Sequence, residues 1–302
     1  MLETPLVFIV FNRPETTRRV WERIRAARPR RLFVIADGPR AARPSEGELC
    51  AAVRQIVAQP DWPCEVTREY STANLGAAVR VSSGLDAVFA QVEEAIILED
   101  DCLPDPTFFP FCAELLARYR AEPRVAQIAG CSFQGENHGG RTSYYFSRYP
   151  HGWGWATWRR AWRHYDHSMR AWREDRGGDW LARCVRDPVE QRIWAQSFDA
   201  TLAGGVDAWD YRWVLAVWRT QGLCVQSYRN LISNIGFGAA ATHTLGTSPW
   251  DSLPLSPMPF PLVHPAGFAR DEAADERTGR LVFRPPSWPA RLVRRLKRIY
   301  SA

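Results

Sequence analysis

Three acidic residues, Glu99, Asp100 and Asp101, directly follow an apolar run of strand length at residues 95–98. A continuous apolar run is typical of a buried parallel strand, and ligands of open α/β sheets bind beyond the carboxyl ends of such strands. Adjacent carboxylates repel one another unless a cation lies among them. Because Mg²⁺ and Mn²⁺ prefer hard oxygen ligands, the acids indicate a divalent metal that holds phosphate groups. A solvated acidic turn is the alternative interpretation.

Polar residues also follow two earlier apolar runs. Residues 6–11 end at Asn12-Arg13, and residues 31–36 end at Asp37. Parallel strands end at one edge of a sheet, so we expect these side chains to lie near the three acids. Asp37 could accept hydrogen bonds from a nucleobase or a ribose, and Arg13 and Arg80 could bind a base or a phosphate. For each residue alone, a loop cap or a surface arginine is the simpler explanation.

The elements that must position these residues alternate along the first half of the chain. Strands are expected at 6–11, 31–36, 64–67, 95–98 and 125–129, and helices at 15–27, 46–58, 74–89 and 107–120. Such alternation predicts right-handed βαβ units and an α/β fold with a mostly parallel central sheet flanked by helices. No GxGxxG or GxxxxGK[ST] motif occurs, so dinucleotide-binding and P-loop proteins lose support.

The chain contains 14 Trp residues, and three of them within residues 155–162 have the spacing of one helix face. We expect that face to belong to the core. The preceding turn, Gly152-Trp153-Gly154, differs because glycines permit a ligand to approach the backbone closely. Trp153 and Gly154 are therefore candidates for contact with a sugar.

Two aspartates precede a later helical pattern that runs to Arg219. Asp207 is expected to be the N-cap of this helix, and Asp210 falls in its first turn, where the helix dipole favours a carboxylate. Capping accounts for one aspartate, so the second is a candidate for chemistry. Further along, residues 230–244 form a polar loop punctuated by glycine, which could close over a bound nucleotide.

The length of 302 residues suits one large α/β domain or two small ones. We expect a catalytic domain over 1–245, with a nucleotide-binding half at about 1–130 and an acceptor half at about 131–245. A proline-rich extended segment at 246–288 and a tail at 289–302 would follow. No stretch of about 20 apolar residues occurs. The seven scattered cysteines lack zinc spacing and are expected to be reduced thiols of a cytoplasmic protein.

The formal net charge of +6 is carried by the end of the chain. From Arg284 onward there are six basic residues and no acid, so the rest has a formal charge of zero (6 − 6). A neutral body argues against nucleic-acid binding. In the tail, 289–302, apolar and basic residues occupy opposite helical faces, which is typical of peripheral contact with an anionic membrane. A helix docked on the body is the alternative.

Short motifs occur in a fixed order: Phe11-Asn12-Arg13-Pro14, Ala36-Asp37-Gly38, Glu99-Asp100-Asp101 with Phe108-Phe109, Gly152-Trp153-Gly154-Trp155 and Trp209-Asp210. This set resembles the nucleotide-sugar transferases of the GT-A fold. It is similar to a bacterial group described as family 2-like glycosyltransferases and, more distantly, to the catalytic domain of N-acetylglucosaminyltransferase I. The resemblance covers about residues 5–245. It implies a Rossmann-like sheet with an acceptor-side subregion after it.

The resemblance also implies roles on the donor side. Arg13 and Asp37 would hold the nucleobase, and Arg80 would lie near the uridine or the diphosphate. Asp100 would contact the donor sugar, and Glu99 would support the site. Arg80 departs from the distant relative, which has His at this place.

The metal and the base follow from the same resemblance. Asp101 would bind Mn²⁺ or Mg²⁺, and His243 is a further candidate ligand for the metal or a phosphate. Asp210 would be the general base, and Tyr211 replaces a second acid after it. The donor expected by resemblance is a UDP-sugar such as UDP-N-acetylglucosamine. The acceptor is expected to be a hydroxyl of a surface glycan or a lipid-linked glycan.

The residues and the resemblance together predict an inverting glycosyltransferase. The metal would offset charge on the leaving nucleoside diphosphate, and Asp210 would take the proton of the acceptor hydroxyl. A sugar nucleotidyltransferase is one alternative, but the expected glycine-rich loop is missing after the first strand, and Lys297 is the single lysine. A non-catalytic carbohydrate-binding protein is another alternative, suggested by the tryptophan content.

Overall fold

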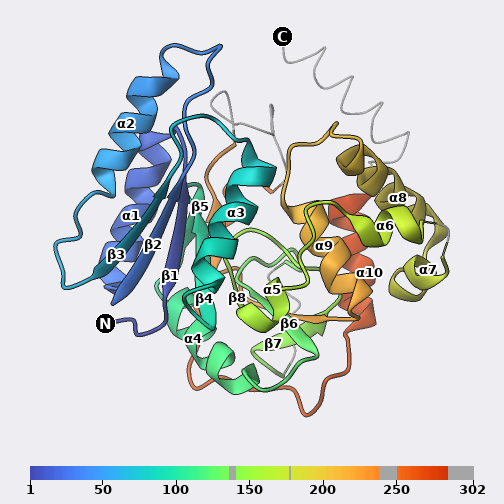
Figure 1. The fold of residues 1–302 in the computed structure, drawn as a ribbon. Helices are drawn as coiled ribbons and strands as arrows, with labels where there is room; N and C mark the ends of the chain where they lie inside the picture. Colours follow the sequence, from blue (N-terminus) through green and yellow to red (C-terminus); the bar gives the residue numbers. More distant parts are fainter. Residues whose placement is uncertain (136–140, 177, 238–249, 285–302) are drawn as a thin grey trace, which may run out of the picture.

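A central sheet with helices on both faces forms the body of the protein in the computed structural model (Figure 1). The structure describes residues 1–135, 141–176, 178–237 and 250–284. The sheet has the order β3-β2-β1-β4-β8-β6-β9-β7. Its parallel strands are β1 (Leu6–Val10), β2 (Arg31–Ala36), β3 (Glu65–Tyr70), β4 (Glu94–Glu99), β6 (Val125–Ala129) and β9 (Leu223–Ser227). The reversed strands are β8 (Trp155–Trp158) and β7 (Tyr144–Ser147). The predicted α/β class with a mostly parallel sheet flanked by helices is confirmed.

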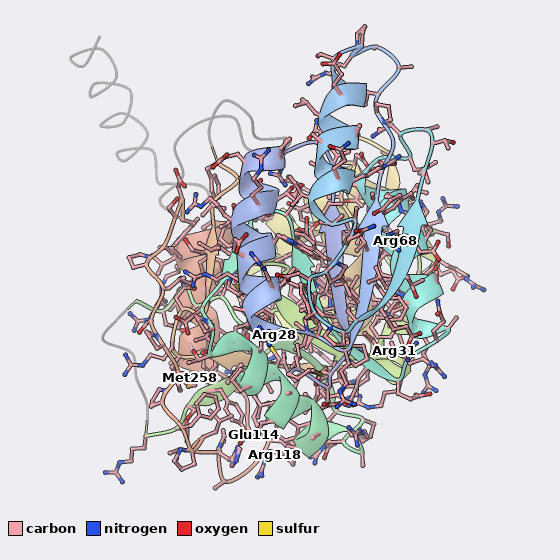
Figure 2. The ribbon with its side chains drawn as sticks, turned by 90° about the vertical axis from the view of Figure 1, so that its left-hand side faces the viewer. Arg28, Arg31, Arg68, Glu114, Arg118 and Met258 are labelled. Atoms are coloured by element: carbon pink, nitrogen blue, oxygen red, sulfur yellow. The ribbon has the colours of Figure 1, made fainter. Side chains whose placement is uncertain are left out.

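Alternate side chains of the strands face two separate cores, as the two-residue period of a strand requires. One core contains Phe8 and Leu98 and is covered by α1 (Pro14–Ala27), α2 (Glu46–Ile56) and α4 (Phe108–Tyr119). Figure 2 looks onto this face, with Glu114 and Arg118 on α4 in front. These helices match the predicted ranges to within two residues at each end.

The other core contains Ile9 and Ile97 and is covered by α3, α5, α8 and α9. The helices of this half are α3 (Ala77–Phe89), α5 (Arg159–Trp162), α6 (Arg170–Glu174), α7 (Trp180–Cys184), α8 (Pro188–Leu202) and α9 (Asp210–Arg219). Helices α3 and α9 therefore lie on the same face of the sheet, although more than a hundred residues separate them in the chain. This arrangement brings together the residues on which the site depends.

The tryptophans at 155–162 were predicted to form one helix face, and this prediction is wrong. Trp155 and Trp158 belong to strand β8, and Trp162 ends the short helix α5. The spacing of three and four residues is not evidence of a helix here. A short strand followed by one helical turn can place tryptophans at the same intervals along the sequence. The prediction that these side chains are core is confirmed, since all three are buried.

The segment predicted to be extended from 246 to 288 is extended only in part. Residues 253–269 contain no helix or strand, but α10 (Glu272–Thr278) and the π-helical turn η1 (Gly279–Phe283) follow. Asp271 caps α10 by accepting a hydrogen bond from Ala274 N at 2.9 Å. The prolines that suggested an extended chain end before this cap. The tail at 289–302 lies outside the described residues.

A second, two-stranded sheet pairs β5 (Cys102–Pro104) with β10 (Ile232–Asn234) in antiparallel register. Strand β5 directly follows the acidic residues, so the pairing places the chain after β10 beside them. Ile235 N donates a hydrogen bond to Asp101 O at 2.8 Å. Among the described helices, none is long and apolar enough to cross a membrane.

Candidate functional site

The acid cluster, Glu99, Asp100 and Asp101, lies at the carboxyl end of β4, between β1 and β8. The end of β1 contacts it directly, because Phe11 N donates a hydrogen bond to Asp100 Oδ2 at 3.1 Å. The expectation that the strand ends converge at one edge of the sheet is confirmed for these two strands.

Arg13 provides the cation that the acid cluster requires. It precedes α1, and its guanidinium forms an ion pair with Asp100 Oδ1 and a second one with Asp101 Oδ2 at 2.9 Å. Burial lowers the pKa of Arg13, but the charges of Asp100 and Asp101 raise it by more, so the guanidinium stays charged. Burial raises the pKa of Asp100, and Arg13 opposes this effect. In this structure Arg13 thus offsets part of the negative charge of the cluster from inside the protein.

Glu99 connects the acid cluster to the second half of the chain. Its Oε1 accepts a hydrogen bond from Trp209 Nε1 at 3.3 Å. Burial raises the pKa of Glu99 to about 8, and the charges of Asp101, Asp100 and Asp210 contribute, against the effect of Arg13. Asp210 is therefore close enough to act electrostatically on Glu99.

Asp210 is the first residue of α9 and is exposed to solvent. Its Oδ1 accepts a hydrogen bond from Tyr211 N at 2.9 Å, which fixes the carboxylate at the helix start. Trp209 precedes it and packs on Trp155 of β8 with ring centroids 5.2 Å apart. The fold thus brings the predicted base near the acid cluster and leaves it accessible from outside.

Asp37 lies at the end of β2 and binds the loop that leads into α3. Its carboxylate accepts hydrogen bonds from Leu75 N at 2.9 Å, Gly76 N at 3.0 Å and Asn74 Nδ2 at 3.0 Å. These contacts give Asp37 a structural role that the sequence did not reveal. Its predicted contact with a nucleobase stays a prediction.

Arg80 lies in the first turn of α3 and is only 9% exposed. In the part of the chain that the structure describes, its guanidinium has no hydrogen bond or ion pair, and its Nε is fully buried. Burial lowers the pKa of Arg80, while the charges of Asp37 and Glu69 raise it by less. Asp37 and Glu69 thus offset the burial of Arg80 only in part, and neither forms an ion pair with it among the described residues.

Asp207 does not cap its own helix, which corrects the expectation from the sequence. Its carboxylate accepts hydrogen bonds from Ala77 N at 3.0 Å and Ala78 N at 2.9 Å, the first two residues of α3. The N-cap position of α9 is occupied by Trp209, without a side-chain cap. A side-chain carboxylate can accept hydrogen bonds from the unpaired backbone N–H groups at the start of any helix that it reaches. The sequence does not show which helix that is.

The turn at 152–154 packs against the protein. A Cβ on Gly152 would contact the ring of Trp209 at 3.2 Å, and a Cβ on Gly154 would collide with Ile232 of β10. Gly154 also has a φ of +58°, which favours glycine. Trp153 is partly buried beside Phe237, with ring centroids 5.8 Å apart. The glycines therefore serve the packing of the site, and the predicted contact of Trp153 and Gly154 with a sugar stays a prediction.

The described residues do not assemble a metal site. No three His, Cys, Asp or Glu side chains converge in a metal-binding geometry within the described ranges. Asp101 Oδ2 is bound to Arg13, and Gly236 lies so close that a Cβ on it would collide with the same oxygen. A cation on this oxygen would have to displace Arg13. His243 lies outside the described residues, so its predicted role and the predicted Mn²⁺ stay predictions.

Several contributors to the site were missed from the sequence. Asn74 supports Asp37, Trp209 binds Glu99, and Gly236 covers the pair of Arg13 and Asp101. The signal for Trp209 was its place next to Asp210. The other two depend on contacts between distant segments and have no local pattern.

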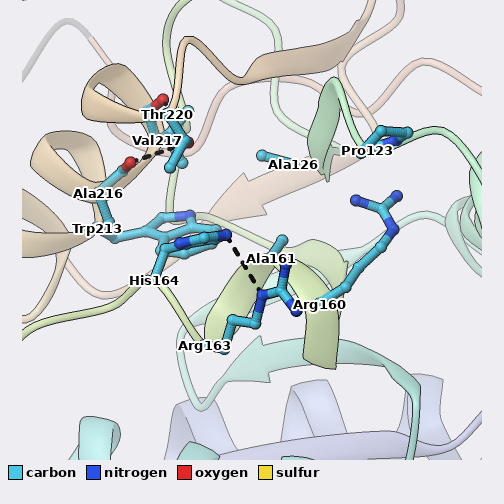
Figure 3. Close-up of a pocket in the computed structure, with 10 residues that line it drawn as sticks. All are labelled: Pro123, Ala126, Arg160, Ala161, Arg163, His164, Trp213, Ala216, Val217 and Thr220. Atoms are coloured by element: carbon cyan, nitrogen blue, oxygen red, sulfur yellow. Dashed lines mark hydrogen bonds between the residues drawn. The ribbon is translucent and has the colours of Figure 1, made fainter.

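A cavity of about 60 Å³ lies at the other end of α9 (Figure 3). It is lined by Arg160, Trp213 and Thr220, among others, and by none of the predicted site residues. The guanidinium of Arg160 donates to the backbone oxygens of Tyr119 and Val125, each at 2.8 Å, and of Arg120 at 3.0 Å. Its donors serve the end of α4, so this cavity is not part of the site.

The comparisons with known proteins found similarity to solved structures only. No family model matches the chain, and no curated protein matches it. Residues 1–349 of TarS from S. aureus match 52% of this chain with a TM-score of 0.34 and 6% identity, and the chain spans about half, 47%, of that structure. The 4-diphosphocytidyl-2C-methyl-D-erythritol synthase from Anaerococcus prevotii matches 76% of this chain and 91% of its own, with a TM-score of 0.37 and 6% identity. Likeness of this extent says nothing about activity.

Proposed function

We propose that this protein is an inverting glycosyltransferase that uses a nucleoside diphosphate sugar as its donor. The observation that supports this most is Arg80 at the start of α3, on the same sheet edge as the acid cluster and Asp210. Its side chain is 9% exposed, its Nε is buried, and within the described ranges its guanidinium has no hydrogen bond or ion pair. A cation for an anionic leaving group and a carboxylate for an acceptor hydroxyl are the two charged groups that such a transfer requires.

The proposed step conserves atoms and charge. The acceptor oxygen attacks the anomeric carbon of the sugar and forms a new C–O bond. The bond from that carbon to the phosphate oxygen breaks, and the nucleoside diphosphate leaves with the electron pair. Asp210 takes the proton of the acceptor hydroxyl, and Arg80 stabilises the negative charge on the leaving phosphate. A single base on the face opposite the leaving group produces inversion.

The acid cluster has a supporting role in this proposal. Arg13 pairs with Asp100 and Asp101, and Glu99 accepts a hydrogen bond from the indole of Trp209, so the cluster fixes the loop before Asp210. The Mn²⁺ or Mg²⁺ expected by resemblance is a variable of the experiment below.

The identity of the substrates is part of the proposal. UDP-N-acetylglucosamine is the proposed donor, and the hydroxyl of a surface glycan or a lipid-linked glycan is the proposed acceptor. A cytoplasmic location with peripheral contact of residues 289–302 to an anionic membrane is proposed with them, on the charge pattern of the sequence.

Thermal shift with a panel of nucleotides tests the donor site. UDP, GDP, CDP, dTDP and ADP are each added with Mn²⁺ and with EDTA, because a ligand that binds only the folded state raises the midpoint of unfolding. We expect one diphosphate to raise the midpoint for the wild type and to have no effect on Arg80→Gln. Arg163→Gln changes an exposed arginine beside the remote cavity and is the matched control.

The outcomes separate the alternatives. A shift in wild type and Arg163→Gln that is lost in Arg80→Gln supports the proposal, and nucleotide-sugar hydrolysis with release of the diphosphate extends it to catalysis. Release of pyrophosphate from a nucleoside triphosphate and a sugar phosphate would instead identify a nucleotidyltransferase. An equal shift in Arg80→Gln would contradict the role of Arg80.

A further inference from the structure

We propose that Asp207 is a positioning residue that couples helix α3 to helix α9 and thereby fixes Asp210 relative to Arg80. This inference depends on the proposed function for its catalytic meaning, but the coupling itself is a structural statement that can be tested separately. Asp207 lies in the loop before α9 and binds the start of α3, so one carboxylate joins two segments that are 130 residues apart.

The carboxylate makes two hydrogen bonds of good length. Oδ2 accepts from Ala77 N at 3.0 Å, and Oδ1 accepts from Ala78 N at 2.9 Å. Both donors belong to the first turn of α3 and would otherwise lack a partner within the helix. The helix dipole strengthens the contact, because its positive end faces the carboxylate.

The backbone of α3 is shaped for this contact. Gly76 precedes the helix with a φ of +79°, and a Cβ on it would lie 2.5 Å from Asp207 Oδ2. Any larger residue at this position would push the carboxylate away. On the other side of Gly76, Asp37 accepts hydrogen bonds from Leu75 N and Gly76 N. Two carboxylates therefore bind four consecutive backbone N–H groups at the entrance of α3.

The same loop carries two further anchors between Asp207 and Asp210. Trp209 donates to Glu99 at 3.3 Å and packs on Trp155 at 5.2 Å. The loop before α9 is therefore fixed to α3, to the end of β4 and to β8. Asp207 supplies the connection to α3, the helix that carries Arg80.

This coupling has a consequence for catalysis. Arg80 is in the first turn of α3, two residues after Ala78, whose backbone N–H donates to Asp207. If Arg80 holds the leaving phosphate and Asp210 removes the proton, the distance between them must match the length of the reacting sugar. Displacement of a reacting group by about 1 Å can cost about a hundredfold in rate. Asp207 sets this distance without contact with the reacting atoms.

Variants on both sides of the contact provide the test. Asp207→Ala removes both acceptors, and Asp207→Asn keeps one acceptor oxygen and should recover part of the loss. Ala77→Pro removes one donor from the α3 side. Proline is well tolerated at the first helical position, and the ψ of 160° at Gly76 suits the residue before a proline.

Asp187→Ala is the matched control. Asp187 caps its own helix, α8, through Val189 N at 2.8 Å, and it also contacts Arg284 at the surface. Its replacement removes a helix cap of the same chemical type but does not connect α3 to α9. Loss of either cap is expected to destabilise the protein to a similar degree, so a difference between the variants reports on the coupling.

The first readout does not require activity. The full-length protein is labelled with 5-fluorotryptophan, and the ¹⁹F resonance of Trp209 is assigned with Trp209→Phe. We expect this resonance to shift or broaden in Asp207→Ala and in Ala77→Pro, and to be unchanged in Asp187→Ala. An unchanged resonance in Ala77→Pro, which lies 132 residues from Trp209 in sequence, would overturn the coupling.

The second readout is steady-state hydrolysis or transfer with UDP-N-acetylglucosamine, UDP-glucose and GDP-mannose as donors. We expect kcat to fall about tenfold to a hundredfold in Asp207→Ala, with a KM for the donor within threefold of wild type and partial recovery in Asp207→Asn. An unchanged kcat would overturn the positioning role. No turnover of any donor by the wild type would count against the proposed function, and the ¹⁹F result would then decide the coupling alone.

Discussion

Two clusters of arginine and carboxylate side chains differ in how far their charged groups are paired with one another and how far they are exposed to solvent. The acid cluster with Arg13, Arg80 and Asp210 lies at the carboxyl edge of the sheet. The buried network, defined as Arg148, Tyr149, Glu190 and Asp275, lies between β7, α8 and α10. Both contain acids and arginines in close contact. From the residue types alone, either cluster could be taken for an active site.

The carboxylates of the buried network have all their partners within the protein. Glu190 accepts hydrogen bonds from Tyr149 Oη and from Trp194 Nε1 at 3.2 Å, and Arg148 lies at 3.4 Å. Asp275 accepts from Ser147 Oγ at 2.5 Å and from Arg148 N at 3.2 Å. The sheet-edge site differs, because no hydrogen bond or ion pair from a described residue reaches the guanidinium of Arg80, and because Asp210 is exposed to solvent. Exposure to solvent and an arginine without such a bond therefore distinguish the candidate site from a network that stabilises the fold.

The largest effect is expected for Asp210→Asn. The amide cannot take a proton, so the transfer rate should fall about 10²- to 10⁴-fold, while the nucleotide-induced thermal shift is preserved. The measurement is kcat together with the shift for the same preparation. Activity near that of wild type in a folded variant would show that the exposed carboxylate is not the base.

Glu190→Ala should show the opposite pattern. It removes the acceptor of Tyr149 and Trp194 and one of the two carboxylates that act on the buried charge of Arg148, which costs about 3 kcal/mol of unfolding free energy. Urea unfolding measures the loss, and nucleotide binding by the folded fraction should equal that of wild type. If binding were lost but stability were unchanged, the assignment of the two clusters would be reversed.

The raised pKa of Asp275 predicts that the free energy of unfolding depends on pH. Burial raises its pKa to about 6, although Ser147 and Arg148 oppose the effect. The folded protein then binds this proton more tightly than the unfolded chain, whose pKa is near 4. The stabilising contribution is therefore complete below about pH 4 and is lost as the pH rises through 6, by about 3 kcal/mol.

The comparison with Asp275→Asn isolates this group from the other carboxylates. The unfolding free energy of wild type minus that of the variant should decrease from pH 4.5 to pH 7 in urea titrations. A difference that does not change with pH would mean that Asp275 is ionised over the whole range in the folded protein.

The smallest effect, and the most diagnostic in sign, is expected for Arg80→Met. The methionine removes a charge whose Nε is buried and has no hydrogen bond among the described residues, so the free energy of unfolding without ligand should rise by about 1 kcal/mol while the nucleotide-induced shift disappears. Thermal and urea unfolding with and without the diphosphate measure both effects. A loss of stability would show that Arg80 has a structural partner in the protein and would weaken the comparison.

The sequence predicted three strands of the parallel half because each is an apolar run that ends at a polar residue. Strands β1, β2 and β4 were found in this way. Strand β7 was missed, and β8 was assigned to a helix. In β8 the aromatic spacing agreed with a helical period, and only the pairing with β4 and β6 reveals a strand.

The candidate site was predictable to the extent that position along a strand determines position in space. Residues 99–101 and Arg13 were identified from the strand ends, and they are in contact. The connection of Asp207 to α3 was not predictable, because a cap in another segment has no pattern in sequence. That no described residue bonds to Arg80 is likewise visible only in the structure.

The reversed strand β8 has a consequence for how the chain emerges during synthesis. Strands β4 and β6 do not pair with each other, and each of them pairs with β8, which is made later than both. A nascent chain that ends before Trp155 therefore exposes the apolar edge of β4 without a partner, and such edges promote association between chains. Fragments that stop between β6 and β8 should aggregate, and slow translation of this interval would prolong the exposure.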